Sequence, residues 1–189
     1  MKLDGLKVAV LVTDGYEPSE LTEPMRALRE AGAQATVISN HDGTIKGKTD
    51  ADTAQVDLTL DAARPEDFGA LLIPGGVKNP DVMRQDQRAV WFVRHIFDAG
   101  KPIASICHGP WMLVEADVVR GRKVTSYPSL QTDLRNAGAE WVDEEVVTDQ
   151  GLVTSRTPDD LPAFNAKMLE EFGEGIHERQ PAVQAGSTA

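Results

Sequence analysis

The amino-acid sequence predicts an α/β fold with a mostly parallel central sheet and helices on both of its faces. Short apolar runs alternate along the chain with longer segments in which apolar residues recur at helical spacing. Three of the helical segments end in the same way, at Gly32, Gly100 and Gly138, and a short extended run follows each glycine. A strand–helix–glycine–strand pattern that recurs within one domain is typical of a three-layer sandwich.

The first half of the chain supplies four predicted strands, at 8–12, 35–38, 56–60 and 68–73. The runs at 8–12 and 68–73 are short and apolar, as in buried parallel strands. Apolar and polar residues alternate over 56–60, which indicates a strand that is buried on one face only. The polar, glycine-bearing stretch between the second and third strands predicts a loop or a small hairpin.

Two helices are predicted in the same half. The first begins at Pro18, carries Ser19 and Glu20 in its first turn, and ends at Gly32. Proline suits the first helical position because its missing N–H would have no partner there, and an acid in the first turn is favoured by the helix dipole. The second helix is expected at 86–99, where apolar residues recur every three or four positions.

In the second half, an apolar strand at 102–106 leads into a turn at Cys107, and a helix follows from Trp111. Further strands are predicted at 122–126, within 140–148 and at 152–155. Ser129 is expected to cap one more helix, and Thr157 with Pro158 is expected to begin the last helix. We expect residues 1–172 to form a single domain and residues 173–189 to form a flexible C-terminal tail.

Composition excludes several classes of protein. The chain has 189 residues, which can bury a sizeable core, and its formal net charge of -11 argues against nucleic acid or an anionic membrane as the main partner. One cysteine cannot form an internal disulfide. The chain has no apolar run long enough to span a bilayer, and its charged start does not resemble a signal peptide, so we expect a cytoplasmic protein.

Cys107 is the strongest candidate for a functional residue. A lone cysteine is usually a small buried hydrophobic residue, and this is the alternative to a functional role for Cys107. However, a residue on a sharp strand-to-helix turn occupies the position of a nucleophile elbow, and the adjacent helix N-terminus favours a thiolate. The next residue is His108, a possible base, and Gly109 with Pro110 suits a tight entry into a helix. His108 could equally be a structural residue packed under the turn.

Other segments are expected to converge on Cys107, because loops at the carboxyl ends of parallel strands form the ligand site of such sheets. Glu17 is either a solvated acid at a helix start or the carboxyl beside the Cys107 sulfur. Gly75 and Gly76 are either a simple turn or a source of N–H groups for an oxyanion hole. No histidine has a metal-binding companion at useful spacing, so we predict neither a metal nor a cofactor.

These motifs resemble those of the PfpI family, the intracellular protease I group. The resemblance is carried by Ala-Ser-Ile-Cys-His-Gly-Pro at 104–110, Pro-Gly-Gly at 74–76, Gly-Tyr-Glu at 15–17 and Thr-Ser-Tyr-Pro at 125–128. The PfpI family lies within a superfamily that includes the parkinsonism-associated deglycase and class I glutamine amidotransferase-like domains. The resemblance implies a flavodoxin-like fold, a reactive cysteine at Cys107 and a neighbouring acid at Glu17.

The resemblance also implies a triad that is completed across a subunit interface of a dimer or hexamer. In it an acid after the Pro-Gly-Gly loop orients the histidine, and the matching position here is Asp81, where well-studied members of the family carry Glu. Family activities include peptidase, cofactor-free glyoxalase and deglycase, so small carbonyl adducts or peptides are the implied substrates. We therefore expect a cysteine-dependent stress enzyme in which a low-pKa thiolate attacks a carbonyl.

Two other hypotheses stay open. Cys107 could be a redox sensor, because an accessible thiolate without a resolving cysteine would be oxidised to sulfinic acid, which Glu17 could hydrogen-bond. The chain could also be an inert α/β domain that oligomerises.

Overall fold

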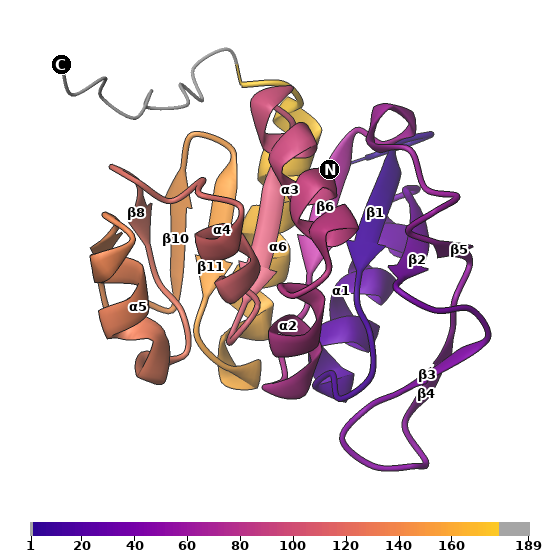
Figure 1. Cartoon of the computed structure of the whole chain (residues 1–189). Helices are drawn as coiled ribbons and strands as arrows, with labels where there is room; N and C mark the ends of the chain where they lie inside the picture. Colours follow the sequence, from indigo (N-terminus) through magenta and orange to yellow (C-terminus); the bar gives the residue numbers. More distant parts are fainter. Residues whose placement is uncertain (1, 178–189) are drawn as a thin grey trace, which may run out of the picture.

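The protein forms a three-layer α/β sandwich around a seven-stranded sheet (Figure 1). The structure is a computed structural model, and it describes residues 2–177. The strand order is β10-β11-β7-β6-β1-β2-β5, and all neighbours are parallel except β10 and β11. The five central strands have the flavodoxin order 2-1-3-4-5, in which the strand order reverses between the first and third strands while all five stay parallel. The predicted fold class is therefore confirmed.

The strands and helices follow one another along the chain as the alternating pattern predicts. The sheet strands are β1 (Lys7–Leu11), β2 (Gln34–Ser39), β5 (Leu58–Thr59), β6 (Ala70–Ile73), β7 (Ile103–Ile106), β10 (Val146–Asp149) and β11 (Leu152–Ser155). Two small pairs lie apart from this sheet: the hairpin of β3 (Thr44–Lys46) with β4 (Thr53–Gln55), and β8 (Lys123–Val124) with β9 (Glu140–Trp141). The hairpin projects from the lower right of Figure 1.

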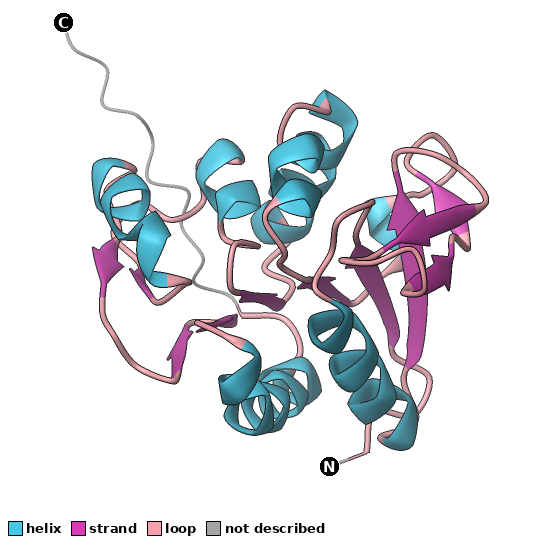
Figure 2. Cartoon of the chain, turned by 90° about the horizontal axis from the view of Figure 1, so that it is seen from below, coloured by secondary structure: helices cyan, strands magenta, loops and turns pink. Residues whose placement is uncertain are grey.

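Helices cover both faces of the sheet, as Figure 2 shows when the molecule is seen from below. One face carries α1 (Pro18–Glu30) and α6 (Leu161–Glu174), which pack against each other. The other face carries α2 (Lys78–Met83), α3 (Gln87–Asp98), α4 (Trp111–Glu115) and α5 (Gln131–Asn136). Short 3-10 turns lie at Pro65–Asp67, Pro128–Leu130 and Pro158–Asp160.

The core is divided in two by the sheet. In β1, Val8 and Val10 point to the α1/α6 side and Ala9 and Leu11 to the other side, because successive side chains of a strand face opposite ways. All four are buried, which explains why the sequence of β1 reads as a continuous apolar run.

Several details differ from the sequence prediction. Helix α2 was not expected, because its six residues around Pro80 give no helical period. Ser129 does not cap a helix: it lies in a 3-10 turn and its hydroxyl contacts His108. Helix α6 continues past the predicted boundary at residue 172 to Glu174, and the His177 N–H donates to the Gly100 carbonyl at 2.9 Å. The rest of the predicted tail, residues 178–189, lies outside the described residues.

Within residues 2–177, none of the helices has both the length and the hydrophobicity needed to cross a bilayer.

Candidate active site

Cys107 lies on the turn between β7 and α4, with a backbone φ of 62°. Left-handed backbone is uncommon and costly for a residue with a side chain, so a cysteine held there is a mark of an active-site turn. The residue is 7% exposed, and its backbone is fixed on both sides: its N–H donates to the Ser155 carbonyl at 3.0 Å and its carbonyl accepts from the Tyr127 N–H at 2.8 Å. The structure thus has the nucleophile-elbow geometry that the sequence predicts.

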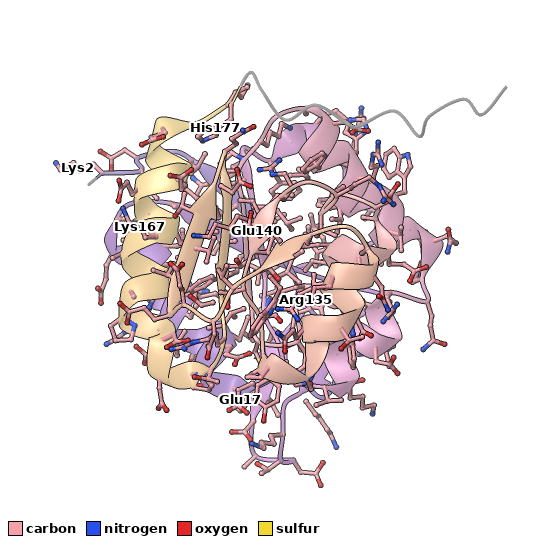
Figure 3. All side chains as sticks on the ribbon, turned by 90° about the vertical axis from the view of Figure 1, so that its left-hand side faces the viewer. Lys2, Glu17, Arg135, Glu140, Lys167 and His177 are labelled. Carbon is pink, nitrogen blue, oxygen red and sulfur yellow. The ribbon has the colours of Figure 1, made fainter. Side chains whose placement is uncertain are left out.

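The carboxyl group beside the sulfur belongs to Glu20, which corrects the expectation for Glu17. Glu20 is fully buried, with 0% exposure, and lies beside Cys107: a Cβ on Gly75 would lie 2.4 Å from Glu20 Oε2 and 2.7 Å from Cys107 Cβ. Its Oε1 has no hydrogen-bond partner among the described residues, so it is free to exchange a proton with the neighbouring thiol. Glu17 instead precedes the helix with extended backbone and pairs with Lys48 at 3.1 Å on the cavity rim. The lower end of Figure 3 shows Glu17 at the edge of the molecule. The sequence does contain a signal that Glu20 faces inward: it lies four residues before Pro24 and eight before Leu28, so helical spacing puts it on the same buried face.

Burial dominates the electrostatics of this pair. It raises the pKa of Glu20 to about 7, although the neighbouring Cys107 thiol and the Gly75 N–H both lower that pKa. It also raises the pKa of Cys107 to about 12, and the neighbouring Glu20 charge acts in the same direction. The surroundings of Cys107 therefore favour its neutral thiol and not the low-pKa thiolate that the sequence predicts. Between these two values the pair holds one proton and one negative charge, and the higher pKa of Cys107 places the proton on the sulfur and the charge on the carboxyl.

His108 contacts the sulfur through its own ring. Its Nδ1 lies 3.2 Å from Cys107 Sγ, and its Nε2 lies 3.3 Å from Ser129 Oγ. The ring stacks on Tyr127 with centroids 4.6 Å apart, and burial lowers the pKa of His108. A neutral imidazole so placed can accept a proton from the thiol. Sequence reasoning missed Ser129 as its partner, because the two residues are 21 positions apart.

Asp81 does not contact His108 within this chain. It lies on α2 with its side chain exposed, while its backbone carbonyl accepts from Gln85 at 2.9 Å. The family resemblance implies that Asp81 acts on His108 of a neighbouring subunit, so the role of Asp81 stays a prediction.

The two glycines of the Pro-Gly-Gly loop have different roles. The Gly75 N–H donates to Glu20 Oε2 at 2.9 Å, so it holds the buried acid and is not available to a substrate, contrary to our expectation. The N–H groups of Gly76 and His108 both point at the Cys107 sulfur and oppose the rise in its pKa. Gly76 has a φ of 81°, and a Cβ there would lie 2.4 Å from the Gly15 carbonyl oxygen. Only glycine therefore fits this position.

A cavity of about 1220 Å³ opens above Cys107. Its walls come from the loop after β1, the Pro-Gly-Gly loop with the start of α2, the elbow, the β3–β4 hairpin, and the single residues Tyr127 and Pro158. The hairpin contributes Lys48, which sequence reasoning did not single out. The hydrogen bond to Glu17 raises the pKa of Lys48, so the lysine carries a positive charge at the rim.

A second polar cluster lies far from this cavity. Glu171, Glu174 and His177 have ligand atoms within 4.8 Å of one another, so His177 does acquire acidic companions once α6 is formed. His177 and Glu17 lie at opposite ends of the molecule in Figure 3. Glu171 already accepts from the Gly151 N–H at 3.1 Å and faces His177 Nε2 at 3.5 Å, so the contacts account for the cluster without a metal.

Comparison with known proteins places these features in a family. Residues 6–171 match the DJ-1/PfpI family. The chain is 48% identical to protein/nucleic acid deglycase 2 of Escherichia coli over 169 residues, which span 88% of this chain and 98% of that protein. It is 49% identical to general stress protein 18 of Bacillus subtilis over 167 residues, 87% of this chain and 96% of that protein.

A third relative and a solved structure agree with this match. Deglycase PfpI of Pyrococcus furiosus is 43% identical over 165 residues, which span 87% of this chain and 98% of that protein. A two-domain protein from Anabaena variabilis with a DJ-1/ThiJ/PfpI-like and a ferritin-like domain superposes with a TM-score of 0.85 at 35% identity. That superposition covers 97% of this chain and 52% of the Anabaena chain.

Proposed function

This chain belongs to the DJ-1/PfpI family, and from that premise we propose that it is a cysteine-dependent hydrolase that acts on carbonyl adducts. Cys107 is the nucleophile and Glu20 is its proton partner. The observation that carries the proposal is a buried carboxyl, with one oxygen that has no hydrogen-bond partner among the described residues, beside a cysteine on a strained turn. In the singly ionised pair, transfer of the thiol proton to the Glu20 carboxylate or to His108 gives the thiolate of Cys107, which is the nucleophilic form.

The addition step uses groups that are already in place. The sulfur forms a bond to the carbonyl carbon, the C=O electron pair moves to the oxygen, and the oxygen takes the proton held by Glu20 or His108. The N–H groups of Gly76 and His108, which point at the sulfur, lie next to the place where that oxygen becomes negative. With a dicarbonyl, a proton then moves from the carbon that carries the new hydroxyl to the neighbouring carbonyl carbon through an enediol, which converts the adduct to a thioester. Water adds to the thioester carbonyl, the C–S bond breaks, the hydroxy acid leaves, and the Glu20–Cys107 pair again holds one proton and one negative charge.

Among the reactions of the family, we favour deglycase- or glyoxalase-like chemistry over proteolysis. Two observations support this order: two of the relatives described above are named deglycases, and Cys107 is mostly buried. At about 1220 Å³ the cavity exceeds the usual range of roughly 300–1,000 Å³ for small-molecule sites. It therefore has room for an adduct on a protein side chain as well as for a free dicarbonyl.

The experiment compares three acids: Glu17, which precedes α1, and Glu20 and Glu23, which lie on α1. We expect Cys107→Ala to abolish the turnover of methylglyoxal and of methylglyoxal-treated peptides, and Glu20→Gln to lower kcat by roughly 10²- to 10⁴-fold, because a proton-transfer group is lost. Glu17→Gln should have a much smaller effect, and Glu23→Gln, which removes only an exposed pair with Arg26, should have none. A Glu20→Gln enzyme with wild-type kcat would refute the role of Glu20. A fluorogenic peptide cleaved faster than either carbonyl substrate would favour the peptidase alternative.

A second candidate is a peroxide sensor, favoured by the N–H groups of Gly76 and His108 that converge on the sulfur of the only cysteine in the chain. Two peroxide molecules would each transfer one oxygen atom to the sulfur and be reduced, leaving a sulfinate with Glu20 as hydrogen-bond donor. A sensor should lose stable sulfinate in Glu20→Gln but keep it in His108→Ala, whereas an enzyme should lose turnover in both. Mass spectrometry of the two peroxide-treated variants, beside the turnover assays, separates the candidates.

A further inference from the structure

Asn79, on α2, uses both polar atoms of its side chain in buried hydrogen bonds to the backbone. Its Nδ2 donates to the carbonyls of Pro74 and Gly75, each at 3.0 Å. Its Oδ1 accepts from the Thr13 N–H at 2.8 Å, just beyond the end of β1. The residue is 1% exposed, so these bonds form away from water, where each is costly to lose. One amide therefore joins the end of β1 to the loop that follows β6.

The two carbonyls that Asn79 holds belong to the peptide groups that serve the active site. A peptide group is planar and trans, so the direction of a carbonyl fixes the direction of the next residue's N–H. The Pro74 carbonyl therefore sets the Gly75 N–H, which donates to Glu20 Oε2 at 2.9 Å. In the same way the Gly75 carbonyl sets the Gly76 N–H, which points at the Cys107 sulfur.

From this geometry we infer that Asn79 is a positioning residue for the active site: its single amide orients the two N–H groups that bind the Glu20 carboxyl and the Cys107 sulfur. The inference rests on the proposed function, in which these two groups share the reactive proton. The loop requires such a constraint because Gly76 has a φ of 81°, a conformation that glycine leaves easily when nothing holds it. Both N–H groups favour the anionic form of the atom they bind, so their orientation decides how readily the pair ionises.

The test is the pH dependence of the rate at which iodoacetamide alkylates Cys107, from about pH 5 to about pH 10. Asn79→Leu has a similar volume and cannot donate to either carbonyl. We expect it to shift the first rise in the alkylation rate upward by about 1 pH unit, because both anions lose a donor. We also expect kcat on a methylglyoxal-treated peptide to fall by about 10²-fold with little change in KM.

Met83→Ala is the matched control, because Met83 lies in the same helix, is buried in the hydrophobic core, and has no side-chain hydrogen-bond donor for the loop carbonyls. It should lower the free energy of unfolding but keep the wild-type pH profile. The inference is overturned if folded Asn79→Leu keeps the wild-type profile, or if Met83→Ala shifts it equally. Asn79→Ser, whose hydroxyl can donate to only one carbonyl, should give a smaller shift and serves if Asn79→Leu does not fold.

A measurement on the wild-type protein needs no variant. The amide protons of Gly75 and Gly76 and the side-chain NH₂ of Asn79 should all change their NMR shifts at the pH where the pair ionises. Signals that do not move together would overturn the inference. Neither alkylation nor NMR uses a carbonyl substrate, so a wild-type protein without turnover would refute the proposed function and leave this test intact.

Discussion

The buried carboxyl of Glu20 couples protein stability to pH. Its pKa is raised from 4.5 to about 7, chiefly by burial, so the folded protein binds a proton that the unfolded chain releases between these values. Stability from this residue is therefore fully present below about pH 4.5 and is lost as pH rises through about 7. An acid kept in such surroundings is typical of a functional site, because a stable core would not require it.

This linkage gives a prediction for Glu20→Gln, which has no proton to lose. Relative to wild type, we expect the free energy of unfolding of Glu20→Gln to increase by about 3 kcal/mol between pH 4 and pH 8. Chemical denaturation at several pH values measures the difference. The exposed Glu23→Gln should show no such trend, and parallel pH curves for wild type and Glu20→Gln would contradict a raised pKa at Glu20.

At the scale of elements, the end of α6 is joined to the turn after α3. The His177 N–H donates to the Gly100 carbonyl, and a Cβ on Gly100 would lie 2.7 Å from the His177 carbonyl oxygen. Gly100 and Gly121 have nearly the same backbone, with φ of 70° and 73°, but a Cβ on Gly121 meets no atom within 4 Å. Substituting each glycine by alanine therefore distinguishes the cost of left-handed backbone, present at both, from the cost of a clash with His177, present only at Gly100.

We expect Gly121→Ala to lower the free energy of unfolding by about 1–2 kcal/mol, which is the cost of left-handed backbone for alanine. Gly100→Ala should cost more, because it adds the clash with His177. Urea denaturation of the two variants tests this order. Equal losses would mean that residues 175–177 do not dock on α3 in solution.

At the scale of the whole molecule, the cavity rim carries surfaces that suit a second copy of the chain. Val77 and Tyr127 line the cavity and are 58% and 40% exposed, although both are large and apolar. Asp81 lies exposed on the same helix that begins at the rim. We propose that the protein is a homo-oligomer with the site near a subunit interface, and that Asp81 of one subunit orients His108 of its neighbour.

Subunit mixing tests this arrangement. Cys107→Ala and Asp81→Ala should each be inactive alone, for different reasons. A refolded mixture should regain part of the turnover, because a hybrid interface pairs an intact Cys107 with an intact Asp81. Sedimentation would establish that the variants still associate. A mixture that stays inactive although it associates would exclude Asp81 as a residue that acts across the interface.

Local patterns in the sequence determined the fold class, most strand positions, the elbow at Cys107 and the Pro-Gly-Gly loop. Apolar runs, prolines and glycines act on the backbone close to where they stand, so these features can be predicted without knowing what lies across the sheet. Tertiary structure alone decided which acid meets the sulfur. Glu17 and Glu20 are three residues apart, but the first precedes α1 and faces the rim, whereas the second lies inside the helix and is buried against the loops that follow β6 and β7. The partners of His108 and the contacts of Asn79 were likewise hidden, because they join segments that only folding brings together.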